Sequence, residues 1–147
     1  MRVYLNICCL NMPFDDQSKE RIKLETDAVL SILDNCQTGE WILIGSEVID
    51  LEISKTPDAE RKKKVSILSS IASSKIIINE EIVKRAIVIS KLKFHPYDAL
   101  HIACAEKSNA DVMLTTDDGL LQKALPSVNF LKIRIGNPVS WLMEVIK

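Results

Sequence analysis

The chain has 147 residues, a formal net charge of -1 and a pI near 6.1. With 47% hydrophobic and 27% charged residues it has an ordinary globular composition, and a single domain over residues 1–147 is the simplest prediction. This charge excludes non-specific nucleic-acid binding through a strongly basic surface, but not a nuclease that reaches phosphate through metal ions.

The four cysteines form no C-x-x-C pattern, and the sequence contains no secretory signal. No apolar stretch approaches the length of a membrane span. We therefore expect a reduced, cytoplasmic protein with no membrane association.

The amino-terminal part alternates strand and helix patterns. Residues 2–9 predict a strand, and the proline and aspartates that follow predict a loop at 11–16. A helical period over 18–36, with Gly39 as its stop, leads to a continuous apolar run at 41–44. Such a run suits an interior parallel strand.

Capping residues mark the next elements. Ser46 is a good N-cap for one helix, and a second helix is expected over 58–73. A third strand is predicted at 75–78. Asn79 then caps a helix that runs to about Leu92.

The last part continues the alternation, with a helix at 97–107, a strand at 112–115, a helix at 117–124, a strand at 130–135 and a helix at 138–146. This order predicts an α/β domain of three layers, α/β/α, with a mainly parallel sheet of about five strands. Right-handed crossovers place the carboxyl ends of the strands along one edge, where α/β proteins hold their sites.

Three acidic residues are expected at that edge. Asp98 lies in the first turn of an apolar helix, Asp117 directly follows a buried strand, and Glu52 lies on the helix after the second strand. Carboxylates beside core elements suggest a partner or a metal. Hard oxygen ligands suit Mg²⁺ or Mn²⁺, and such an ion could activate water and neutralise charge on a phosphodiester.

Several segments carry a family resemblance: Val3–Asn6, Ser46–Ile53, Asp98–Ala105 and Leu114–Asp118. With them, most of the chain resembles PIN-domain ribonucleases, including the toxin subunits of bacterial toxin–antitoxin pairs. The Asp98 segment followed by Thr-Thr-Asp is the most specific part.

The resemblance implies a metal-dependent endoribonuclease that prefers single-stranded RNA. Its catalytic acids, which would also bind the metal, would be Glu52, Asp98 and Asp117, with Thr116 or Asp118 as supporting residues. It also implies a homodimer and an antitoxin protein as partners.

The family pattern places an aspartate where this chain has Asn6. Asparagine offers one neutral oxygen to a metal and removes a negative charge, which weakens metal affinity. The alternative function is therefore a catalytically degenerate PIN-like module that binds RNA or a protein without cleaving.

Other residues allow a structural interpretation beside the functional one. Asp98 could complement a helix dipole, and Asp117 could be an N-cap that also faces a metal. Ser46 is foremost an N-cap, with a role in contacting metal-bound water as the alternative. His101 shares a helix face with Asp98; a satisfied core histidine is preferred over a hydrogen-bonding neighbour of the site.

Charged residues on two helices are expected at the surface. Glu47 and Asp50 are more consistent with solvated positions than Glu52, which lies between two apolar residues. The run at 60–64 predicts a solvated helix face, with guidance of RNA as the alternative. A different α/β hydrolase or phosphatase is disfavoured because no nucleophile elbow is present.

Overall fold

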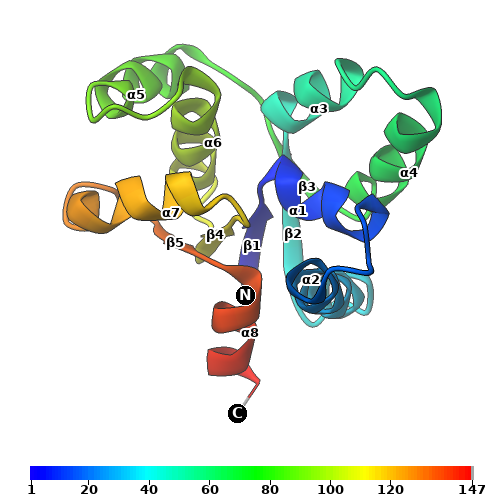
Figure 1. Ribbon diagram of the computed structural model, residues 1–147. Coiled ribbons are helices and arrows are strands. Elements are labelled where there is room, and N and C mark those ends of the chain that lie inside the picture. Colours follow the sequence, from blue (N-terminus) through cyan, green and yellow to red (C-terminus); the bar gives the residue numbers. More distant parts are fainter. Residues whose placement is uncertain (147) are drawn as a thin grey trace.

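A computed structural model describes residues 1–146; Lys147, the last residue of the predicted domain, lies outside the described residues. All five strands form one parallel sheet in the order β3-β2-β1-β4-β5 (Figure 1). The strands are β1 (Arg2–Leu5), β2 (Ile42–Ser46), β3 (Ser74–Ile76), β4 (Val112–Leu114) and β5 (Arg134–Gly136).

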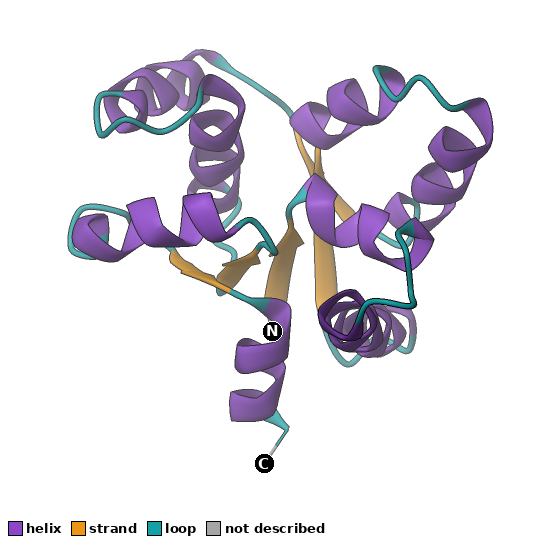
Figure 2. Ribbon diagram, viewed as in Figure 1, coloured by secondary structure: helices purple, strands orange, loops and turns teal. Residues whose placement is uncertain are grey.

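Helices connect the strands and enclose the sheet (Figure 2). They are α1 (Ile7–Asn11), α2 (Glu20–Gln37), α3 (Glu47–Ser54), α4 (Ala59–Ser69), α5 (Glu80–Ser90), α6 (Pro96–Lys107), α7 (Asp118–Ala124) and α8 (Pro138–Val145), with 3-10 helices η1 (Met12–Phe14) and η2 (Leu125–Ser127). Helix α2 contacts β2 and α8, whereas α6 contacts β2, β4 and α5. The predicted three-layer α/β class is confirmed. Within residues 1–146, no helix combines the length and the apolar character needed to cross a membrane.

Local capping explains where several helices begin and end. The side-chain oxygens of Ser46, Asn79 and Asp117 accept hydrogen bonds from backbone N–H groups three residues later, at 3.1, 2.9 and 3.2 Å. Gly39, just beyond α2, has a φ of +90°, which glycine adopts without steric cost. The sequence predicted all four positions.

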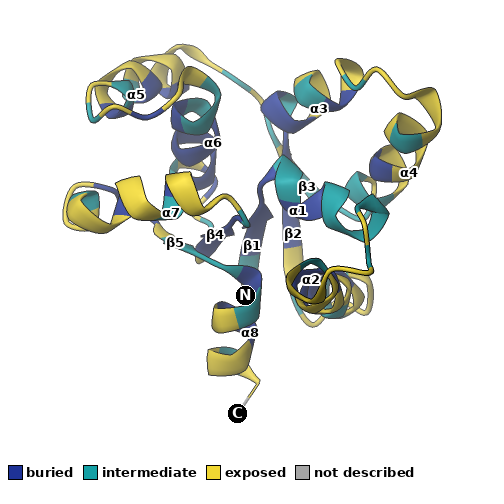
Figure 3. Ribbon diagram, in the orientation of Figure 1, coloured by how far each residue is buried: buried dark blue, intermediate teal, exposed yellow. Residues whose placement is uncertain are grey.

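The core lies along the middle strands, which Figure 3 colours as buried. Val112, Met113 and Leu114 of β4 are fully buried, as are Val3 and Tyr4 of β1. Such continuous burial is expected for parallel strands that are covered on both faces.

The first strand is shorter than the sequence predicted. It ends at Leu5, and α1 begins at Ile7, with the N–H of Cys9 donating to the carbonyl of Asn6 at 2.9 Å. Periodicity alone does not separate a short apolar helix from a strand, which is why the prediction extended to Cys9. Asn6 therefore stands directly after β1 and not within it.

Smaller corrections concern the sheet edges and one loop. The fifth strand begins at Arg134 and not at Phe130, because the N–H groups of Phe130 and Leu131 donate to the Ser127 carbonyl at 2.9 and 3.0 Å. The third strand starts and ends earlier than predicted, and the loop expected at 11–16 contains η1.

The strand order fixes where a site is expected. The connection from β1 leads to β2, on one side of β1. The connection from β4 leads in the opposite direction across the sheet, to β5. The carboxyl ends of β1 and β4 thus flank a topological switch point, where open α/β sheets bind their ligands.

Candidate functional site

Polar groups from two chain segments meet at this switch point. Asn6 is buried, and its Nδ2 donates to Oγ1 of Thr115 at 3.3 Å. The same Thr115 oxygen accepts from the N–H of Asp117 at 3.1 Å. The bond through Nδ2 leaves Oδ1 of Asn6 as the amide atom that could face a cation.

Asp98 is half-buried in the first turn of α6. Burial raises the pKa of its carboxyl above the ordinary value, and the charges of Asp117 and Glu52 raise it further. His101 and His95 act in the opposite direction and lower that pKa. Asp98 is therefore within electrostatic range of both Asp117 and Glu52, although Glu52 lies on α3, Asp98 on α6 and Asp117 at the N-cap of α7.

A buried chain of hydrogen bonds stands behind Glu52. The carboxylate of Glu52 can only accept, so it takes a hydrogen bond from Nε2–H of His101. Nδ1 of His101 then accepts from the hydroxyl of Tyr4 at 2.6 Å, and the Tyr4 hydroxyl lies 2.8 Å from Oγ of Ser46. Burial raises the pKa of Tyr4 well above its ordinary value, which keeps this hydroxyl protonated. This chain of hydrogen bonds fixes the position of the Glu52 side chain.

The acids suit a hydrated cation better than a closed metal cage. Within residues 1–146, no three His, Cys, Asp or Glu side chains gather closely enough to hold a metal on their own. Mg²⁺, however, binds through one or two carboxylates and keeps several waters. Asp98 and Asp117, with Glu52 nearby, are donors of that kind.

The predicted supporting residues have defined contacts. The buried Ser46 hydroxyl caps α3 and also contacts Tyr4. The N–H of Thr116 donates to Sγ of Cys8 at 3.3 Å. Asp118 is exposed and accepts two hydrogen bonds from Arg21, both of 2.7 Å.

Residues 20–125 match the sequence model of the PIN domain family. The chain belongs to the PIN domain family. A comparison with curated proteins gave no match.

A solved structure resembles this PIN domain over nearly its whole length. It is the crystal structure of VapBC2 from Rickettsia felis bound to a DNA fragment from their promoter, with a TM-score of 0.61 and 15% sequence identity. The match covers 93% of this chain and 98% of that chain. At this identity it supports the fold alone, and it agrees with the parallel sheet of this PIN domain.

Sequence reasoning missed Tyr4 as part of the site of this PIN domain. A tyrosine inside a buried apolar strand needs a partner for its hydroxyl, and that signal could have drawn attention to it. His101 is the buried, satisfied histidine that the sequence favoured, and its hydrogen bond to Glu52 makes it also the neighbour of the site that was the alternative.

A second missed group links α2 to this edge of the PIN domain. Glu25 is buried and accepts from Nδ2 of Asn137 at 2.8 Å, and Arg21 lies 3.4 Å from it. Because Arg21 also pairs with Asp118, it connects α2 to the start of α7.

Of the two acids expected at the surface, Asp50 is exposed as predicted and Glu47 is half-buried. Glu47 accepts from the N–H of Ile78 at 2.7 Å, and Asp50 pairs with Lys75. Within the basic run at 60–64, Arg61 donates to the carbonyl of Phe14 at 2.6 Å and thereby holds η1. The lysines that follow Arg61 are exposed, as predicted.

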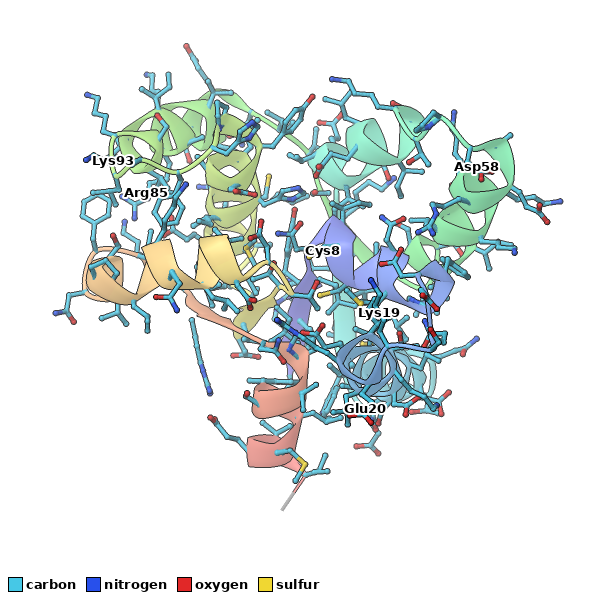
Figure 4. The ribbon with its side chains drawn as sticks, in the orientation of Figure 1. Cys8, Lys19, Glu20, Asp58, Arg85 and Lys93 are labelled. Atoms are coloured by element: carbon cyan, nitrogen blue, oxygen red, sulfur yellow. The ribbon has the colours of Figure 1, made fainter. Side chains whose placement is uncertain are left out.

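Cys8, which Figure 4 labels, has the lowest pKa of the four thiols, and its Sγ lies 3.3 Å from Oγ1 of Thr115, the atom to which Nδ2 of Asn6 also donates. A hydrogen bond from Cys9 lowers its pKa to about 6, helped by donation from Thr115 and Thr116 and opposed by burial. Burial raises the pKa of Cys36 to about 11 and that of Cys104 to about 12.

The Tyr4→Phe variant is expected to be about 1–3 kcal/mol less stable, because His101 Nδ1 and the Ser46 hydroxyl both lose a buried partner. Urea denaturation measures this loss. The matched control is Tyr97→Phe, which removes the hydroxyl of the other tyrosine. Within residues 1–146 that hydroxyl bonds exposed Lys55 alone, so its loss should change stability by less than about 0.5 kcal/mol. Equal losses in the two variants would contradict the hydrogen-bond chain.

Proposed function

We propose that the chain is an endoribonuclease that cleaves single-stranded RNA with the help of Mg²⁺ or Mn²⁺. The observation that carries the proposal is the concentration of negative charge at the switch point, where burial raises the pKa of Asp98 and the charges of Asp117 and Glu52 raise it further. A bound cation relieves that repulsion, and carboxylate oxygens are the donors that such cations prefer.

Each residue of the site would have its own role. Asp98 and Asp117 hold the cation, and His101 holds Glu52 in position beside them. Asn6 supplies a neutral oxygen through Oδ1. When bound, a divalent ion lowers the pKa of water and neutralises charge on the phosphodiester.

An antitoxin protein and a second copy of the chain are the proposed partners. Family resemblance supports both, and the structural match to VapBC2 is consistent with an antitoxin. The reducing interior of a cell is the proposed location, in keeping with the four free thiols.

Asn6 favours a second candidate, a PIN-fold module that binds RNA or a protein without cleaving. A neutral amide at the switch point gives the cation one charged ligand fewer. The two candidates share the fold and differ in the chemical step.

The test uses the purified chain with labelled single-stranded RNA and Mn²⁺. We expect metal-dependent cleavage that stops in chelator and spares the same RNA annealed to its complement, as read on denaturing gels. The Asp98→Asn variant, purified in parallel, controls for contaminating nucleases.

Absence of both cleavage and Mn²⁺ binding would overturn the proposed site. RNA binding without cleavage would select the binding module instead.

A further inference from the structure

Two aromatic rings lie at the start of α6, next to the acids. His95 is exposed and Tyr97 is half-buried, and they stand three residues and one residue before Asp98. Their ring centroids are 6.0 Å apart and their planes differ by 11°, so the rings are stacked. An aligned pair of flat rings at the surface is the geometry on which nucleobases stack.

Local bonds hold these rings in place. Nδ1 of His95 accepts from the N–H of Tyr97 at 3.2 Å, so the histidine caps α6 through its own ring. Pro96 between them fixes the backbone at the first helical position. The rings are therefore ordered before any ligand binds, which lowers the entropic cost of stacking.

A lysine lies next to the hydroxyl of Tyr97. Nζ of exposed Lys55 lies 2.5 Å from Oη of Tyr97 and 5.1 Å from its ring centroid. These two distances place the ammonium beyond the hydroxyl and away from the ring centre. Lys55 ends α3, and its N–H donates to the carbonyl of Glu52 at 3.2 Å.

The rings and the lysine therefore come from the same two helix ends that carry Asp98 and Glu52. Resting on the proposed function, we infer that His95 and Tyr97 form a stacking platform for a nucleobase of the single-stranded RNA, while Lys55 contacts a neighbouring phosphate. Stacking needs an unpaired base, so the platform accounts for the preference for single strands.

Binding is measured in chelator, where no cleavage occurs, by fluorescence anisotropy with two probes. One is a fluorescein-labelled single-stranded RNA of mixed sequence, and the other is an abasic backbone of equal length. We expect Tyr97→Leu to weaken binding of the base-bearing RNA by about five- to 150-fold and to leave the abasic probe unaffected.

The companion variants separate stacking from charge. Tyr97→Phe keeps the ring and should bind as the native chain does. Lys55→Gln should weaken both probes alike and reduce the salt dependence by about one unit of slope. Phe130→Ala is the matched aromatic control: Phe130 is exposed and packs on Arg85, which pairs with Glu106 near the end of α6 and not at its start.

The stacking platform and the proposed nuclease activity can be disproved separately. Unchanged binding by Tyr97→Leu, or an equal loss on both probes, would overturn the platform even if the native chain cleaves RNA. A base-dependent loss in chelator would support the platform even if no cleavage is found. In an active enzyme, the platform further requires Tyr97→Leu to raise KM with kcat nearly unchanged.

Discussion

The Asp98→Asn variant is expected to lose metal-dependent RNA cleavage by at least about 100-fold, because changing even an outer partner of a metal ligand costs ~10–100-fold. Asparagine keeps the shape of the side chain and removes its charge. Initial cleavage rates at several Mn²⁺ concentrations measure the effect. The matched control is Asp58→Asn at the N-cap of α4, where asparagine caps as well as aspartate.

The same variant is expected to be more stable than the native chain in chelator near neutral pH. The folded state raises the pKa of Asp98, so it binds the proton more tightly than the unfolded state does. Stability is therefore lost as the pH rises from the ordinary carboxyl range through the raised pKa. Asp98→Asn removes that loss. Thermal melts across this range, with and without Mn²⁺, measure it.

Two outcomes would count against this account of Asp98. Native rates in Asp98→Asn would remove Asp98 from the site. A lower melting temperature of the variant in chelator would mean that the charge of Asp98 stabilises the fold, as a helix-dipole residue does.

The Asn6→Asp variant is expected to bind Mn²⁺ about tenfold more tightly and to cleave faster, because each added ligand charge strengthens a carboxylate site. The new carboxylate would stand close to Thr115 and Asp117, where Nδ2 of Asn6 now donates to Thr115. Without metal, this buried charge should cost about 1–3 kcal/mol of stability. Calorimetric Mn²⁺ titration and melts in chelator measure the two effects.

Asn11→Asp is the matched control for that change. Asn11 ends α1, and its Oδ1 already accepts from Arg61 at 3.1 Å, so a carboxylate there has a partner. Cleavage only after Asn6→Asp would identify the native chain as a binding module. Unchanged Mn²⁺ affinity in Asn6→Asp would place Asn6 outside the metal site.

The fold could be predicted because its signals are local. Continuous apolar runs mark buried parallel strands. Ser46, Asn79 and Asp117 mark helix starts, because each side chain accepts from the backbone N–H three residues ahead. The prediction erred where local signals are ambiguous. The apolar run after Asn6 suits either a strand or a helix, and the fold forms α1 there.

The candidate site, too, could be predicted from the sequence only in part. The sequence by itself placed Asp98 and Asp117 at the starts of helices beside core elements. It also showed a neutral Asn6 where the family resemblance leads one to expect an aspartate. Only the tertiary structure joined Tyr4 to His101 and Lys55 to Tyr97. Those contacts link segments far apart in the chain, and periodicity and capping carry no information about such pairs, because packing of the sheet and helices decides which distant side chains meet.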